Sequence, residues 1–290
     1  MRSLVILAFA GFLAQLIDGA LGMGYGVTSS SMLLALGVAP AVASASVHAG
    51  EVVTTLVSGV AHWRFGNVDR GMMWRLGVPG AVGAFLGAWL LTLLPVEAAR
   101  VGVAGFLFLL GVVVLVRFVR AGRVRLTTSR PLPTGWLVPL GFVAGLLDAT
   151  GGGGWGPVTT TTLVAREPAR ARRVIGSVDA SEFLVAVSAT AGFVMALGWE
   201  GISWLWVAAI VLGGAAAAPL AAWLVRKLPL EVLGVTVGAM IILYNARTLL
   251  AALGVPVPPG VVLLVFLVPA LALLLLPGRL RTAREEADPV

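Results

Sequence analysis

The chain has 290 residues, of which 59% are hydrophobic and 11% are charged, and its formal net charge is +7. Soluble domains carry roughly a quarter charged residues, so this composition and the mean hydropathy of +1.01 exclude an ordinary soluble protein. The basic residues stand in short loops between apolar runs, which indicates membrane orientation and not nucleic-acid binding. Because there is no cysteine, disulfides, thiolate metal sites and thiol catalysis are also excluded.

Apolar segments follow one another along the chain and predict an all-α polytopic membrane protein. Each is close to or above the ~18 residues that favour a membrane helix. The segments are 4–36, 43–62, 76–94, 98–117, 135–165, 174–197, 203–225, 230–252 and 260–276. The first resembles a signal peptide, but part of it recurs deep in the chain, so we expect it to belong to the fold.

Positive charge is concentrated in the loops after the second, fourth, fifth, seventh and ninth segments. The loops at 95–100, 198–202 and 253–259 are poor in arginine and lysine. Basic loops stay on the cytoplasmic side of a membrane. The pattern therefore predicts a multi-pass protein of the cell membrane, with its N-terminus outside and its C-terminus in the cytoplasm.

The fifth segment, 135–165, lies between two basic loops, so the chain enters and leaves on the same side. A straight helix of this length is too long for a ~30 Å hydrocarbon core, and two full spans need about 40 residues. A re-entrant hairpin of two half-length helices satisfies both limits. The first segment, 4–36, has the same length and the same glycine-rich middle.

These two hairpins match each other at a constant offset of 130 residues, which indicates an internal duplication. Asp18 falls on Asp148, Tyr25 falls on Trp155, and three glycines of each hairpin coincide. Further along, Ser46-Val-His-Ala-Gly-Glu51 parallels Ser177-Val-Asp-Ala-Ser-Glu182, and Ala88-Trp89 parallels Ala222-Trp223. Paired acidic and tryptophan residues in the same order are hard to explain by apolar composition alone.

The duplication predicts how the chain is organised. Residues 1–125 form a first repeat, 126–255 a second, and 256–290 an additional transmembrane helix with a cytoplasmic tail. Each repeat contains one hairpin and three crossings, and because three is odd the second copy is inverted. Inverted repeats with broken helices at their interface are typical of secondary transporters.

The glycine-rich hairpin in both halves, with Gly-Gly-Gly-Gly-Trp-Gly-Pro at 151–157, resembles that of the TauE/SafE family of sulfite and organosulfur anion exporters. The resemblance covers most of residues 10–250. It implies a membrane carrier for small anions such as sulfite or sulfoacetate. The first copy differs in reading Gly-Met-Gly-Tyr-Gly-Val at 22–27.

Glycines let backbone approach a ligand closely, while serine and threonine are good N-caps. We therefore expect the second arm of each hairpin to begin near Ser29 and near Pro157–Thr159, with the two helix starts meeting at mid-membrane. Helix starts bind anions through free amides and the helix dipole. The predicted substrate-binding residues are Gly22, Gly24, Tyr25, Gly26, Ser29, Ser30, Gly152, Gly154, Trp155, Gly156, Thr159 and Thr160.

Ionisable groups inside a membrane are costly and usually face a pathway or a partner. Six such residues predict proton coupling, in which a proton neutralises the site when an anion binds: Asp18, His48, Glu51, Asp148, Asp179 and Glu182. The alternative is that the acids bind a cation directly. Glycines and hydroxyls that merely pack helices together are the structural alternative.

An intramembrane enzyme acting on a lipid phosphate is the main alternative from another class. The hairpins contain no arginine, which argues against phosphoryl chemistry. A Ser/His protease has candidate residues in Ser29–Ser31 and His48, but no Gly-x-Ser-x-Gly motif is present. The sequence therefore predicts a transporter that has no catalytic residues, metal site or cofactor. Its predicted partners are a small anionic solute and the lipid bilayer.

Overall fold

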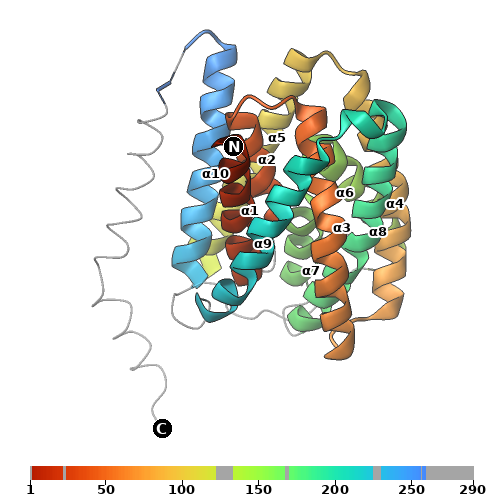
Figure 1. Cartoon of the computed structure of the whole chain (residues 1–290). Helices are drawn as coiled ribbons and strands as arrows, with labels where there is room; N and C mark the ends of the chain where they lie inside the picture. Colours follow the sequence, from red (N-terminus) through yellow and green to blue (C-terminus); the bar gives the residue numbers. More distant parts are fainter. Residues whose placement is uncertain are drawn as a thin grey trace, which may run out of the picture.

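The computed structural model describes residues 2–21, 24–121, 133–166, 170–224, 230–255 and 257–258. Within these residues all regular structure is helical (Figure 1). The helices are α1 (Arg2–Leu21), α2 (Tyr25–Ala35), α3 (Pro40–Arg64), α4 (Arg70–Leu93), α5 (Val96–Ala121), α6 (Leu137–Gly151), α7 (Thr161–Arg166), α8 (Ala171–Leu197), α9 (Trp204–Leu224) and α10 (Leu230–Ala252). The expected segment 260–276 and the tail after it lie outside the described residues.

Short helical turns complete the chain path. They are the 3-10 turns Thr134–Trp136 and Trp199–Gly201 and the π-helical turn η2 (Gly156–Thr160), which leads into α7. Helix α1 starts at Arg2 and packs against α9.

Local chemistry explains where several helices begin and end. Pro40 stands in the first turn of α3, where its missing N–H costs nothing. Asp69 precedes α4, and its carboxylate accepts a hydrogen bond from the amide of Met72 at 3.1 Å. At the far end of α8, Gly198 takes a φ of 76° and a ψ of 164°, a non-helical conformation that favours glycine and ends the helix.

Among the described residues, three helices are long and apolar enough to cross a membrane: Arg70–Leu93, Val96–Val119 and Arg172–Leu197. Shorter apolar helices run over Leu4–Gln15, Trp204–Ala217 and Val237–Ala252. Large apolar side chains such as Val57, Leu109 and Leu212 lie on the outer surface of the bundle. An apolar exterior of this kind suits a lipid environment.

The two halves of the chain exchange helices when they pack. Helix α1 packs on α9, α6 packs on α4, α3 packs on α8, and α5 packs on α10 (Figure 1). Close approach depends on glycine at matching places: a Cβ on Gly11 would overlap the carbonyl of Ile210, and one on Gly141 would overlap that of Leu76. The core of the bundle therefore lies between the halves and not within either one.

Candidate functional site

Two helix breaks meet at the centre of the bundle. The first separates α1 from α2, where Gly24 has a φ of 115°. The second separates α6 from η2, where Gly152 and Gly153 have φ values of 71° and 149°. Only glycine adopts such conformations readily. The two breaks touch, because a Cβ on Gly26 would lie 2.8 Å from the Cα of Gly153.

An aspartate closes each break in the same way. Asp18 Oδ1 accepts a hydrogen bond from the amide of Tyr25 at 3.3 Å, and Asp148 Oδ1 accepts one from the amide of Trp155 at 2.8 Å. Both pairs span seven residues and stand 130 residues apart. A carboxylate bonded to a helix start satisfies a free amide and interacts favourably with the helix dipole. Sequence reasoning missed this capping role, although the repeated Asp-to-aromatic spacing was visible.

The second arms start earlier than the serine and threonine runs suggest. Because Gly24 takes the left-handed conformation, α2 begins at Tyr25, four residues before the expected start near Ser29. Ser31 and Thr159 accordingly donate to carbonyls of their own helices, those of Val27 and Trp155. These hydroxyls are therefore not N-caps, and the expected arm start near Ser29 is corrected to Tyr25.

Other hydroxyl groups tie the first half of the chain to the second hairpin. The hydroxyl of Ser30 donates to the carbonyl of Gly152, and that of Ser44 donates to the carbonyl of Ala149 at 2.7 Å. Both acceptors lie at the end of α6, whose last carbonyl groups lack helical partners. These two bonds hold the end of α6 against α2 and α3.

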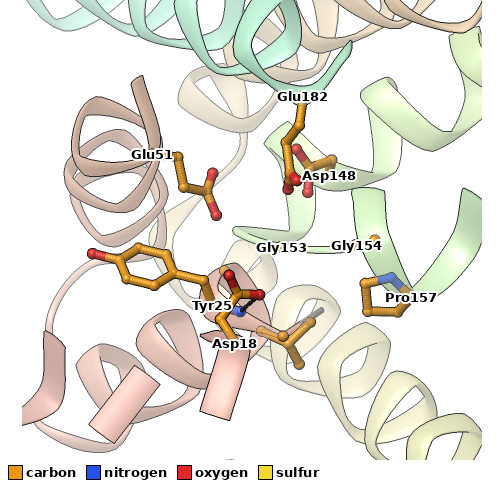
Figure 2. Close-up of a pocket in the computed structure, with 12 residues that line it drawn as sticks. Asp18, Tyr25, Glu51, Asp148, Gly153, Gly154, Pro157 and Glu182 are labelled. Carbon is orange, nitrogen blue, oxygen red and sulfur yellow. Dashed lines mark hydrogen bonds between the residues drawn. The ribbon is translucent and has the colours of Figure 1, made fainter. Parts of the chain in front are cut away.

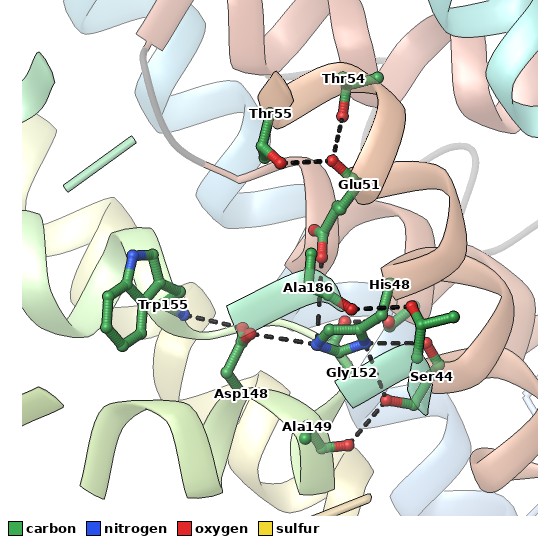
Figure 3. A network of polar contacts seen from close by, with 12 residues as sticks. Ser44, His48, Glu51, Thr54, Thr55, Asp148, Ala149, Gly152, Trp155 and Ala186 are labelled. Atoms are coloured by element: carbon green, nitrogen blue, oxygen red, sulfur yellow. Dashed lines mark hydrogen bonds and ion pairs between the residues drawn. The ribbon is translucent and has the colours of Figure 1, made fainter. Parts of the chain in front are cut away.

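His48 is completely buried and bonded at both ring nitrogens (Figure 3). Its Nδ1 lies 2.8 Å from the backbone oxygen of Ser44, and its Nε2 lies 3.1 Å from Asp148 Oδ2. Since a carbonyl oxygen can only accept, Nδ1 carries a hydrogen. A further proton lies between Nε2 and Oδ2. The Asp148 carboxylate thus connects α3 to the start of the second arm.

Glu51 lies one turn beyond His48 on the same helix, and it is only 2% exposed. Its Oε2 is 4.0 Å from His48 Nε2 and has no hydrogen-bond partner among the described residues. Burying an unpaired polar atom is costly, so we expect this oxygen to bind a ligand or a proton.

A metal ion is the first ligand to consider for these three side chains. His48, Glu51 and Asp148 offer one nitrogen and two oxygens that lie within 4.8 Å of one another, close enough for three ligands of one ion. In the structure, however, Nε2 and Oδ2 are bonded directly to each other. An ion would have to displace the proton between them, so the arrangement suits a proton better than a metal.

A small cavity of about 10 Å³ lies where the two breaks meet (Figure 2). That volume is close to what one water molecule needs. Its lining combines backbone from both breaks with four carboxyl groups that come from α1, α3, α6 and α8. The residues are Asp18, Gly24, Tyr25, Gly26, Val27, Glu51, Asp148, Gly153, Gly154, Gly156, Pro157 and Glu182.

A larger polar cavity of about 180 Å³ adjoins the small one and shares Asp18, Tyr25, Glu51 and Glu182 with it. It extends to the ends of α3 and α8 that adjoin arginine-rich loops. Its other lining residues are Gln15, Thr54, Thr55, Ser58, His62, Ile175 and Asp179. Within it, the hydroxyl of Ser58 donates to Asp179 Oδ2 at 2.7 Å.

The structure brings many, but not all, of the predicted site residues together. The small cavity contains five of the predicted glycine-hairpin residues and four of the predicted acids: Gly24, Tyr25, Gly26, Gly154, Gly156, Asp18, Glu51, Asp148 and Glu182. Ser29, Ser30, Thr159 and Thr160 are buried but line neither polar cavity. Gly22 lies outside the described residues.

Trp155 also lies apart from the cavities. Its side chain is fully buried, and its indole N–H donates to the carbonyl of Val178 at 3.1 Å. The ring therefore anchors the second arm to α8. The amide of Trp155, bonded to Asp148, is the part that belongs to the break.

Sequence reasoning missed other residues at the site. Gln15, Ser44 and Gly153 are examples, since each is an ordinary residue of an apolar helix or a glycine run until the helices pack. A small residue or a single hydroxyl carries little signal in a sequence this rich in both.

Comparison with known proteins finds relatives that match most of the chain in sequence. The model of the family described as "Sulfite exporter TauE/SafE" matches residues 7–248. "Probable membrane transporter protein YtnM" of Bacillus subtilis (strain 168) is 55% identical over 251 residues, covering 86% of this chain and 84% of that protein. "Probable membrane transporter protein YdhB" of the same strain is 27% identical over 177 residues, covering 61% and 71%. No solved structure matches.

Proposed function

From the premise that this chain belongs to the TauE/SafE sulfite exporter family, we propose that it is a secondary transporter for a small oxyanion such as sulfite or a sulfonate. Family membership makes it a multi-pass membrane transporter. The substrate and the coupling ion are inferred from the centre of the bundle. The observation that carries the proposal is that two helix starts from different halves meet there.

Reciprocal packing supports an inverted repeat made of residues 1–125 and 126–255. Gly11 and Gly141 are related by the offset of 130, and their contact partners Ile210 and Leu76 are related by 134. The offset of 134 also relates Ala88 to Ala222 in the sequence. Two re-entrant hairpins entering from opposite faces would produce such an exchange of partners.

The anion would bind to backbone amides at the helix breaks. Gly26 and Val27 are in the first turn of α2, and Gly156 opens η2, so these amides lack acceptors within their helices. All three residues line the small cavity. Amides at a helix start, together with the dipole of the helix, favour a negative ligand.

Ionised acids around the cavity would repel an anion that binds without a proton. Asp18, Glu51, Asp148 and Glu182 all line it, and His48 supplies the neighbouring imidazole. Several charges of one sign cannot persist together in a low-dielectric site. The transporter would therefore bring one or more protons with each anion, held by these acids together with Asp179.

Orientation follows from the loops. With the arginine-rich loops in the cytoplasm, the N-terminus lies outside and the C-terminus inside. The larger cavity extends to His62 and Ile175, near the basic loops, so this conformation would face the cytoplasm.

A cation carrier is the second candidate function. It is favoured by a specific observation, because four carboxyl groups line the small cavity. In such a carrier the acids would bind the transported cation directly, and the glycine breaks would only admit it. Transport assays separate the two functions.

The test is flux into proteoliposomes containing the purified protein. Sulfite, methanesulfonate, sulfate, small carboxylates, Na⁺ and K⁺ are supplied separately, with and without a pH gradient. We expect accumulation of at least one oxyanion in the more alkaline compartment, because a proton-coupled anion follows the proton. Accumulation of a cation without any oxyanion flux would support the second candidate, and equal oxyanion fluxes with and without the gradient would exclude proton coupling.

A further inference from the structure

The two repeats place different side chains at one equivalent position near the centre. His48 of α3 and Asp179 of α8 occupy the third position of the matched segments 46–51 and 177–182. His48 contacts Asp148, the aspartate that caps the second break. Its counterpart Asp179 shares the larger cavity with Asp18, the aspartate that caps the first break.

We propose that the transported proton is bound and released by the Asp18–Asp179 pair, whereas His48 and Asp148 form a permanent pair that keeps its own proton. This assignment rests on the proposed proton-coupled transport and selects two of the six intramembrane candidates. It makes the two repeats functionally unequal despite their common architecture.

Access to water is the first reason for the assignment. His48 and Asp148 are 0% and 2% exposed, and neither lines the larger cavity. Asp18 and Asp179 both line that cavity, whose volume of about 180 Å³ accommodates several water molecules. A proton can therefore reach the second pair through water in the larger cavity, whereas Asp148 lines only the small cavity and His48 lines neither.

Charge is the second reason. The histidine bonded to Asp148 neutralises it within that pair, but Asp179, which lines the same cavity as Asp18, adds a second negative charge there. Two carboxylates that share a cavity in a low-dielectric environment bind one proton between them. The donor hydroxyl of Ser58 stabilises one charge on Asp179, which leaves one site for the proton.

Among the described residues that line the larger cavity, no lysine or arginine supplies a permanent positive charge that could replace the proton. Facing this cavity are the phenol of Tyr25 from α2, Glu51 and His62 from α3, and Glu182 from α8. Among their described residues, helices α9 and α10, which pack on α1, contribute no lining residue. Tyr25, Glu51 and Glu182 add no positive charge, and His62 stands in the last turn of α3.

Position links this proton to the anion. Asp18 accepts from the amide of Tyr25, which is next to the amides of Gly26 and Val27 at the start of α2. A negative charge on Asp18 repels an anion at these amides, and a proton on the pair removes that repulsion. Binding of the proton and binding of the anion therefore favour each other, which is a coupling between two sites.

The test compares two transport modes of the full-length protein in proteoliposomes. Radiolabelled methanesulfonate is the probe, because its charge stays constant across neutral pH. Exchange of labelled for unlabelled anion needs no net proton movement, whereas accumulation driven by a pH gradient does. If one proton accompanies each anion, a gradient of one pH unit supports up to about tenfold accumulation.

We expect Asp179→Asn to keep exchange but to lose the gradient-driven accumulation, from about tenfold to about onefold, and Asp18→Asn to lose the accumulation as well. Asp179→Glu should restore it, and Asp179→His, which copies the other repeat, should not. Asp69→Asn is the matched control, since Asp69 lies outside both cavities, at the start of α4, and should behave like wild type.

Different outcomes overturn different claims. If wild type neither exchanges nor accumulates methanesulfonate, the proposed sulfonate transport is wrong. If wild type accumulates it and Asp18→Asn and Asp179→Asn do so equally well, the transported proton lies elsewhere and this assignment is wrong. If Asp179→Asn fails to fold, the comparison of Asp179→His with Asp179→Glu decides, because loss of accumulation in both variants would contradict a role for the carboxyl group.

Discussion

At the scale of single residues, the aspartates in the middle of the two hairpins do more than carry charge. Asp148 accepts a bond from the amide of Trp155 and contacts His48, so one carboxylate organises both a helix start and a neighbouring helix. Asp18 makes the corresponding bond to Tyr25. In the proposed mechanism, Asp18 therefore serves both proton transport and helix capping, whereas Asp148 serves capping and the pairing with His48.

The first prediction compares these two aspartates. Asp148→Asn should destabilise the protein by about 3 kcal/mol, because it leaves His48 in a buried pair without its charged partner. Asp18→Asn should cost only about 1 kcal/mol, since its bond to Tyr25 is longer and it contacts no histidine. Thermal unfolding in detergent would measure both. Equal melting temperatures for the two variants would contradict the unequal roles.

At the scale of helices, the bond pattern of the second arms repeats between the halves. Asn245 of α10 donates to Ser31 of α2 at 2.7 Å, and Arg117 of α5 donates to Thr161 of α7 at 3.0 Å. The two hydroxyl acceptors are again 130 residues apart. Each second arm is thus bonded to a helix from the other half of the chain: α2 to α10, and α7 to α5.

The second prediction concerns the contact between the hairpin tips. Gly153→Ala should abolish transport, because the new Cβ would overlap the backbone of Gly26 and Val27 and force the tips apart. Gly37→Ala is the matched control: Gly37 also has a positive φ, 85°, but nothing lies within 4 Å of its Cβ position. Its cost should be about 1 kcal/mol with transport retained.

Oxyanion flux and the amount of folded protein should be measured together for both glycine variants. Normal flux in Gly153→Ala would show that the tips do not need to touch. If Gly37→Ala folds normally but loses flux, then backbone strain at a positive φ is enough to stop transport, and the loss in Gly153→Ala could not be assigned to the tip contact.

Much of this arrangement could be predicted from the sequence, and the parts that could not share a physical reason. Apolar length predicts the helices, and paired Asp and Gly residues predict two equivalent breaks, because those signals are local. Helix α2 starts at Tyr25 and not near Ser29 as the sequence predicts, because the conformation of Gly24, not the serine hydroxyls, determines where it begins. The contact of His48 with Asp148 joins residues 100 positions apart, and no local pattern contains it.

At the scale of the whole molecule, the exchange of helices between halves explains why the site is central. Helix α1 packs on α9 and α6 packs on α4, so each hairpin is supported by a helix of the other half. A movement of one half relative to the other would therefore act directly on the two breaks. Inverted-repeat transporters achieve alternating access by rocking one repeat against the other.

The last prediction tests the inverted orientation directly. Because the chain has no cysteine, single cysteines can be introduced without background labelling. Phe65 after α3 and Leu253 after α10 are both 78% exposed, so Phe65→Cys and Leu253→Cys should fold normally. An impermeant maleimide added to intact cells should label Leu253→Cys at least tenfold more than Phe65→Cys, because the loop charges predict that the first lies outside and the second in the cytoplasm. After the cells are opened, both should label equally, which controls for reactivity. Equal labelling in intact cells would place the two loops on one side, and the odd number of crossings that inverts the second repeat would be wrong.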